Sequence, residues 1–166
     1  RRKMDKETAI KVLEIMKNAD GGCEFCVRKL FLEFIKEFPT YAYLARKAFR
    51  EKFEKDLITE DLVNGIIKEV INLVLQEHNL SLDKLILFGS RARKEQRQDS
   101  DWDILLIVRE SLDKQIKRIL FKEITENLSY YLIPCDVIIK SYEEVEFSKD
   151  FYGTAAYEAL NEGIAL

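Results

Sequence analysis

The sequence predicts an α/β fold: a small β-sheet layered with helices, preceded by an all-helical N-terminal extension. Two short apolar runs, Leu85–Phe88 and Ile104–Val108, are typical of buried strands. A third strand is expected at Asp136–Ile139, because Pro134 just before it suits the start of a strand. The segments between and around these runs show the spacing of apolar residues that is typical of amphipathic helices.

The N-terminal extension, residues 1–58, shows the pattern of three short helices. Asp5 is a candidate N-cap for the first helix, whose apolar stripe is Ala9, Val12, Leu13 and Met16. A glycine pair ends this helix, and the second is expected over residues 23–37. Pro39 interrupts the pattern, and the third helix is expected over residues 41–55.

The remaining residues, 59–166, form the predicted second domain. A helix beginning near Thr59 is assigned to it because that helix runs directly into the first strand. Its apolar face consists of Val63, Ile66, Ile67, Val70, Ile71 and Val74. Another helix is expected over residues 112–130. A final helix is expected over residues 149–161, and it carries Phe151, Ala155 and Ala159.

Composition is that of an ordinary globular protein, with 47% hydrophobic and 34% charged residues. No apolar run approaches the roughly 18 residues of a membrane span. The basic start, residues 1–3, leads into an amphipathic pattern, so we expect no signal peptide. Three cysteines, an odd number, argue against a secreted disulfide framework. We therefore expect a cytoplasmic protein without membrane association.

Charge is divided unevenly between the two parts. Residues 1–58 contain 14 Lys/Arg and 10 Asp/Glu, a balance of +4, whereas residues 59–166 carry −7. Because phosphate contacts need a basic surface, the acidic second part makes nucleic acid an unlikely partner. The basic extension suits an acidic partner or its own acidic neighbour.

The segment between the first two strands carries the residues that indicate chemistry. Gly89-Ser90 closes the first strand, and Asp101-Trp102-Asp103 opens the second. Since strand side chains alternate, the two aspartates point to one face and Trp102 points to the core. Adjacent carboxylates repel unless a cation lies between them, and oxygen ligands suit Mg²⁺. Either motif alone is weak, because turns and strand-end aspartates are common; their combination indicates phosphoryl transfer.

Other residues of this region complete the candidate site. Gly89 allows a tight turn whose N–H groups face phosphate, and Ser90 adds a hydroxyl. Arg91 and Arg93 are candidates to bind a triphosphate, since guanidinium binds phosphate bidentately. Aspartate is depleted inside strands, so Asp136 has either a functional role or the ordinary role of a strand-start residue facing water.

These residues resemble the polymerase-β-like nucleotidyltransferase superfamily, and most closely its minimal nucleotidyltransferase class. That class has a Gly-Ser turn, ten intervening residues and Asp-x-Asp, which Gly89-Ser90, residues 91–100 and Asp101-Trp102-Asp103 reproduce. A third carboxylate on a later strand corresponds to Asp136. The resemblance covers roughly residues 60–166. Lys94 stands where members often have glycine, which predicts a different path for the following loop.

The resemblance implies a small mixed sheet. It also implies transfer of a nucleoside monophosphate to a hydroxyl group with release of pyrophosphate, and we expect AMP to be transferred from ATP. It implies that Mg²⁺ is held by the catalytic residues Asp101, Asp103 and Asp136, and that Asp136 is the general base if one is needed. It also implies nucleotide-binding roles for Gly89, Ser90, Arg91 and Arg93.

The resemblance further implies a choice between two acceptors. Minimal nucleotidyltransferases are often paired with a HEPN-type ribonuclease toxin, which some of them adenylylate as antitoxins. Relatives that modify small molecules usually carry a larger partner domain. The extension of some 58 residues therefore favours a protein acceptor, and its helices are also a candidate homodimer surface. The competing hypothesis is a non-catalytic module that keeps the fold and neutralises a partner by contact, supported by the departure at Lys94.

Two further segments have alternative interpretations. Cys23 and Cys26 are either a redox pair, half of a zinc site or, as the sequence favours, buried or half-buried structural cysteines. A zinc site needs four ligands, and the chain adds only Cys135 and His78 unless a dimer shares the site. His78 is expected to act as a charge near a helix C-terminus. The basic and aromatic residues 41–55 form either a partner surface or an ordinary amphipathic helix, which the pattern favours.

Overall fold

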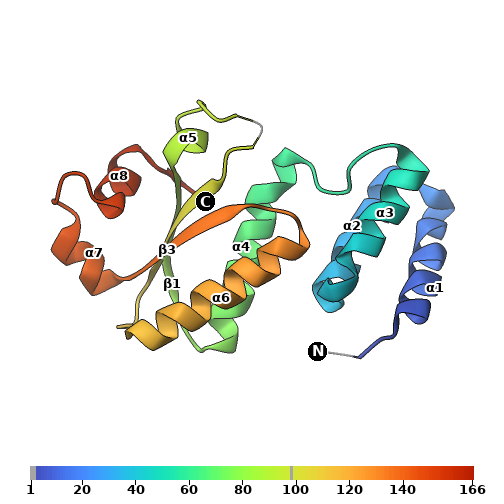
Figure 1. Ribbon diagram of the computed structural model, residues 1–166, viewed down its shortest axis with the longest axis horizontal. Coiled ribbons are helices and arrows are strands. Elements are labelled where there is room, and N and C mark those ends of the chain that lie inside the picture. The colour runs from blue at the N-terminus through green and yellow to red at the C-terminus, as the bar shows by residue number, and fades with distance from the viewer. Residues whose placement is uncertain (1–2, 98) are drawn as a thin grey trace. The chain divides into compact units, whose positions relative to one another are not determined.

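The computed structural model describes residues 3–97 and 99–166, and its elements are shown in Figure 1. Arg1 and Arg2 of the expected extension, and Gln98 of the loop between the first two strands, lie outside the described residues. The chain forms two compact units, Arg1–Val63 and Asn64–Leu166. The division lies within a helix, a few residues beyond the predicted boundary.

The first unit contains the three expected helices: α1 (Lys6–Lys17), α2 (Glu24–Glu37) and α3 (Ala42–Phe53). Asp5 caps α1 as predicted, because its side chain accepts a hydrogen bond from the Thr8 amide. Two short 3₁₀ turns, Ala19–Gly22 and Pro39–Tyr41, connect the helices.

A core of its own holds the first unit together. Phe31 and Phe49 are fully buried and pack edge to face, with ring centroids 6.2 Å apart. The other buried side chains come from the apolar stripes of the three helices and include Ala9, Leu13, Val27, Phe34, Ile35 and Ala45. Residues 42–53 therefore form the amphipathic helix that the sequence favours, with Phe53 half-buried.

The second unit contains a four-stranded mixed sheet of order β3-β2-β1-β4. In chain order its elements are α4 (Glu60–Glu77, which begins in the first unit), β1 (Leu82–Phe88), α5 (Gly89–Ala92), β2 (Trp102–Val108), α6 (Lys114–Tyr130), β3 (Cys135–Ser141), α7 (Tyr142–Ser148), α8 (Ala155–Glu162) and β4 (Ile164–Ala165). β2 runs antiparallel to β1 and parallel to β3, and β4 pairs antiparallel with β1. The fold class is therefore the predicted α/β class with a small mixed sheet.

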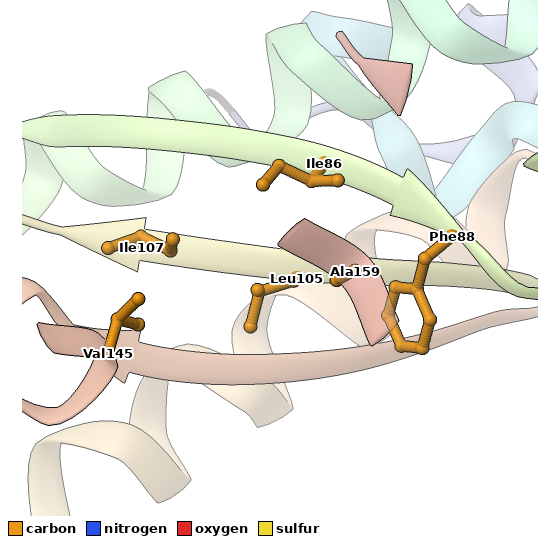
Figure 2. Packing of buried hydrophobic residues seen from close by; sticks show 6 residues of the cluster. All are labelled: Ile86, Phe88, Leu105, Ile107, Val145 and Ala159. Carbon is orange, nitrogen blue, oxygen red and sulfur yellow. The ribbon is translucent and has the colours of Figure 1, made fainter. Parts of the chain in front are cut away.

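Alternation along the strands gives each face of the sheet its own core. On one face, side chains of β1 and β2 pack against α7 and α8, as Figure 2 shows for Ile86, Phe88, Leu105, Ile107, Val145 and Ala159. The intervening β2 residues, Trp102, Ile104 and Leu106, are buried on the opposite face. α6 packs along β3.

The C-terminal part differs from the prediction of one helix over residues 149–161. Two helices occupy residues 142–162, separated by a turn in which Gly153 has a φ of +79°. Phe151, expected to lie in a helix, lies in that turn and is 51% exposed. The helices could not be continuous because this glycine conformation ends helical geometry.

Among the described residues, no helix combines the length and the apolar character that crossing a membrane requires.

Candidate active site

The sheet brings the three predicted carboxylates to one region. Asp103 of β2 and Asp136 of β3 are aligned partners in the parallel pairing, and Asp101 lies two residues before Asp103. Aligned residues of neighbouring strands point to the same face, and so do residues two apart along one strand. Asp103 is half-buried, whereas Asp101 and Asp136 are exposed. The carboxylates therefore lie on the sheet face that also carries α7 and α8, at its solvent-accessible end.

The electrostatic environment of Asp103 perturbs its carboxyl group. Burial raises the pKa of its carboxyl, and the negative charges of Asp136 and Asp101 raise it further. The positive charges of Arg93 and Arg91 partly offset this effect. The negative charge of ionised Asp103 is therefore only partly balanced by nearby positive charges. Carboxylates perturbed in this way are frequent in functional sites.

Oxygen donors of this kind fit a hard divalent cation such as Mg²⁺. However, residues 3–97 and 99–166 contain no group of three or more His, Cys, Asp or Glu side chains arranged so that it could hold a metal ion. The accumulation of negative charge at Asp103 and the all-oxygen donor set agree with a cation-binding role. The side chains as placed do not form a metal centre.

Gly89 gives Asp103 the space that it occupies. Its φ is +70°, and a Cβ at this position would overlap a carboxylate oxygen of Asp103. Only glycine therefore combines this left-handed backbone with so close an approach. Gly89 and Ser90 open the short helix α5, and the Ser90 carbonyl accepts a hydrogen bond of 2.9 Å from the Glu95 amide.

Arg91 makes intramolecular contacts that the sequence did not indicate. Its Nε and Nη2 atoms donate to the Ser100 carbonyl at 3.1 and 2.6 Å, and its guanidinium lies 4.2 Å from the centroid of the Trp102 ring. Arg91 therefore ties the two ends of the loop between α5 and β2 together. Trp102 is buried as predicted, but it also supports this arginine, a role that sequence alternation does not reveal.

Arg93 makes ion pairs with two glutamates. It is exposed and donates to Glu95 at 2.9 Å, with Glu162 at 3.7 Å. The hydrogen bond to Glu95 raises the pKa of Arg93, which stays charged. The positive charge of Arg93 also lowers the pKa of Asp103, and a guanidinium of this kind can bind phosphate bidentately.

Lys94 occupies the position where the family pattern has glycine, and it adopts a glycine-like conformation with a φ of +60°. Its amide donates to the Arg91 carbonyl at 3.3 Å. The chain thus makes the left-handed turn natural to glycine, at a cost in backbone strain.

The remaining candidate ligands are separated from the carboxylates or unsuited to metal binding. Cys135 precedes Asp136, and burial followed by the charges of Asp136 and Asp103 raises the pKa of its thiol to about 12. His78 directly follows the last residue of α4, and its Nε2 lies 2.7 Å from a carboxylate oxygen of Glu123 in α6. Cys23 is exposed, which corrects the prediction that both cysteines of the pair are at least half-buried.

Comparison with known proteins identifies the family of this region. Residues 67–160, more than half of the chain, match the family model described as "Nucleotidyltransferase domain". The matched range includes every site residue predicted from the sequence, from Gly89 to Asp136. A search of curated proteins finds no match to the chain.

Proposed function

The chain belongs to the nucleotidyltransferase domain family, and from that membership we propose that it transfers AMP from ATP to a hydroxyl group of a partner protein in a Mg²⁺-dependent reaction. Nucleotidyl transfer follows from the family, whereas the nucleotide, the cation and the acceptor are our proposal. We also propose that it belongs to the minimal nucleotidyltransferase class.

One observation carries the proposal. Asp101, Asp103 and Asp136 gather on one sheet face, and burial together with its two neighbours raises the pKa of Asp103. Such an arrangement reduces the stability of the fold, because like charges on adjacent strands repel. A cluster of carboxylates that opposes folding is expected at a functional site where a cation, bound together with a triphosphate, offsets the repulsion.

The three carboxylates are the residues that would hold Mg²⁺. When bound, Mg²⁺ would neutralise the triphosphate and lower the pKa of the attacking hydroxyl. Asp136 is exposed and would accept the proton of that hydroxyl as the general base. Gly89 lets the Asp103 carboxylate lie directly against the backbone of the turn, and N–H groups of such a turn would bind phosphate oxygens.

The basic residues have separate tasks in this proposal. Arg93 would bind the phosphate chain with its charged fork, exchanging its exposed contact with Glu95 for phosphate oxygens. Arg91 would act indirectly, since its bonds to Ser100 and its contact with Trp102 hold the loop that leads into Asp101. Ser90 would add a hydroxyl donor at the start of the turn.

A protein acceptor is proposed from the domain organisation. The first unit has its own helical core, and all of the candidate catalytic residues belong to the second unit. A helical unit of this size suits protein contact, including a homodimer or a HEPN-type toxin whose adenylylation would make this chain an antitoxin. The cytoplasm is the proposed location.

The test is a transfer assay with Mg²⁺ and each α-labelled NTP, with and without the candidate partner protein. We expect label from ATP on the partner with the native chain and none with the Asp101→Asn/Asp103→Asn variant. Asp150→Asn is a matched control, because Asp150 is exposed in the turn after α7. Equal labelling by the native and double-variant chains would contradict the proposal.

A second candidate is a non-catalytic module that neutralises its partner by contact. It is favoured by the finding that Arg91 is engaged within the protein, through its hydrogen bond to the Ser100 carbonyl. The Asp101→Asn/Asp103→Asn variant separates the two candidates. A contact module would keep its protection of the partner after this change, whereas a transferase would lose protection and labelling together.

A further inference from the structure

A pair of thiols at the start of α2 has a geometry that nucleotidyl transfer does not use. Cys23 is the N-cap residue of α2, and its Sγ accepts a hydrogen bond from the Cys26 amide at 3.4 Å. The two Sγ atoms lie 3.2 Å apart. The Cys26 thiol also donates to a carboxylate oxygen of Asp20 at 2.9 Å. Two thiols and one carboxylate thus form a contiguous cluster.

The backbone before α2 is shaped to bring Asp20 to the thiols. Asp20, Gly21 and Gly22 have φ values of +50°, +68° and +70°, so three successive residues are left-handed. A Cβ on Gly22 would overlap the amino group of Lys52, which itself donates to the Lys17 carbonyl. The turn is therefore held between α1 and α3, and it folds the carboxylate of Asp20 back over the first turn of α2.

Sulfur geometry favours a disulfide over a metal site. Two thiolates on a tetrahedral zinc ion lie about 3.7 Å apart, given Zn–S bonds of about 2.3 Å. The observed separation is shorter, and no group of three or more ligand side chains in the described residues is arranged to hold a metal ion. Closing to a disulfide length of about 2.05 Å requires a movement of only about 1.2 Å.

The two thiols are electrostatically unequal. The hydrogen bond from the Cys26 amide, followed by the contact with the Cys26 thiol, lowers the pKa of Cys23, which is exposed at the N-terminus of the helix. The hydrogen bond to Asp20, followed by the contact with Cys23, raises the pKa of Cys26 to about 12. An accessible thiol that ionises readily thus lies beside a thiol that remains protonated, which is the division of roles needed for thiol–disulfide exchange.

We propose that Cys23 and Cys26 form a reversible disulfide by exchange with a low-molecular-weight disulfide such as oxidised glutathione. The thiolate of Cys23 attacks one sulfur of the small disulfide, forms a mixed disulfide and releases one glutathione thiolate. The sulfur of Cys26 then attacks the Cys23 sulfur, forms the protein disulfide and releases the second glutathione. Two protons pass from the cysteines to the two released thiolates, and two electrons pass from the cysteines to glutathione.

Asp20 has a defined part in this exchange. By holding the proton of Cys26, its carboxylate prevents that sulfur from attacking first, so the small disulfide reacts at Cys23. Asp20 is a positioning residue here, since it acts through Cys26 and does not touch the small disulfide. The reverse reaction, with excess reduced glutathione, restores both thiols and the contact with Asp20.

The experiment begins with the full chain, reduced and freed of metal, incubated with oxidised glutathione and then alkylated under denaturing conditions. The reduced protein should show three alkylated cysteines, because all three are free. The oxidised protein should show one, at Cys135, together with the mass loss of two hydrogen atoms. Reduced glutathione should restore all three sites. Retention of three reactive thiols, or a stable glutathione adduct without ring closure, would overturn the proposal.

Variants assign the roles of the individual residues. Cys26→Ser should stop at a mixed disulfide on Cys23, whereas the control Cys135→Ser should still close the disulfide. In native protein, limiting iodoacetamide should label Cys23 at least about tenfold faster than Cys26. Asp20→Asn should reduce this preference. Equal labelling of the two cysteines in the native chain would contradict the assignment of Cys23 as the attacking residue.

Zinc provides the competing outcome. The reduced chain is incubated with Zn²⁺ alone and the bound metal is measured after removal of excess ion. Protection of both thiols by one tightly bound Zn²⁺ would show a metal site and overturn the redox proposal. Absence of stoichiometric zinc, with disulfide formation by glutathione, is the expected result.

Discussion

Asp103 of β2 and Asp136 of β3 are aligned partners across the parallel pairing of their strands. Burial raises the pKa of Asp103, and the charge of Asp136 is the next largest contribution to that shift. The metal-free protein therefore carries an unfavourable charge pair within its sheet. The same pair provides the negative potential that attracts a divalent cation, so stability and function oppose each other here.

Replacing Asp136 by asparagine should separate these two effects. We expect Asp136→Asn to lower the pKa of Asp103 and to raise the free energy of unfolding by about 0.5 kcal/mol, because a like-charge pair across strands is removed. Nucleotidyl transfer should be lost. Carboxylate NMR titration and urea unfolding measure the first two effects, with Asp150→Asn as the control. An unchanged pKa of Asp103 would show that burial alone perturbs it.

The raised pKa of Asp103 also predicts a pH dependence of stability. A group with a higher pKa in the folded state binds its proton more tightly there, so folding loses stability as pH rises through that pKa. The loss begins near the unfolded value of about 3.9. The difference in unfolding free energy between native protein and Asp103→Asn isolates this group, and it should decline as pH rises. A flat difference would contradict the shift.

Gly89 offers a test of the close approach to Asp103. Gly89→Ala should lower the free energy of unfolding by about 2 kcal/mol or more, since it combines a left-handed φ with overlap of the carboxylate. Gly153→Ala is a matched control, because Gly153 has a φ of +79° and no atom within 4 Å of the added Cβ. Urea unfolding of both variants gives the decrease in the free energy of unfolding, and a larger decrease for Gly89→Ala than for Gly153→Ala measures the overlap with Asp103. Equal decreases would mean that backbone strain accounts for the whole effect.

Much of the architecture was predictable because it depends on local patterns. The apolar runs of β1 and β2, the third strand and the Asp5 cap were confirmed, as was the α/β class. β4 was missed because Ile164–Ala165 is too short for periodicity, and backbone pairing with β1 alone defines it. The start of α7 did have a local signal, the capping box between Ser141 and Glu144.

The site was predictable only in part. Spacing and strand alternation identify Asp101 and Asp103 as neighbours, but the pairing of Asp103 with Asp136 depends on the register of two strands separated by α6. The contacts of Arg91 depend on the path of a loop, because Ser100 lies nine residues later in the chain. The sequence suggested that Arg91 binds phosphate. Residue type alone does not decide between partners, because a guanidinium donates hydrogen bonds equally well to phosphate and to a backbone carbonyl.

Lys94 predicts a stabilising substitution. Because the φ of Lys94 is +60°, Lys94→Gly should raise the free energy of unfolding by about 1 kcal/mol. This is the cost of holding a residue that has a Cβ in the left-handed conformation. Lys94→Ala keeps the Cβ and should give no such gain, which makes it the control. Thermal or urea unfolding measures both. A gain from alanine as large as that from glycine would trace the effect to the lysine charge and not to the backbone.

Arg91 and Arg93 should respond differently to truncation. Arg91→Ala removes the bonds to Ser100 and the contact with Trp102, so we expect a loss of about 1–3 kcal/mol in unfolding free energy. The fluorescence of Trp102, the single tryptophan of the chain, should change as well. Arg93→Ala should leave stability within about 0.5 kcal/mol, because its ion pairs are exposed, and should weaken binding of ATP. The converse pattern, with Arg91→Ala stable and defective only in ATP binding, would show that Arg91 leaves Ser100 to bind phosphate.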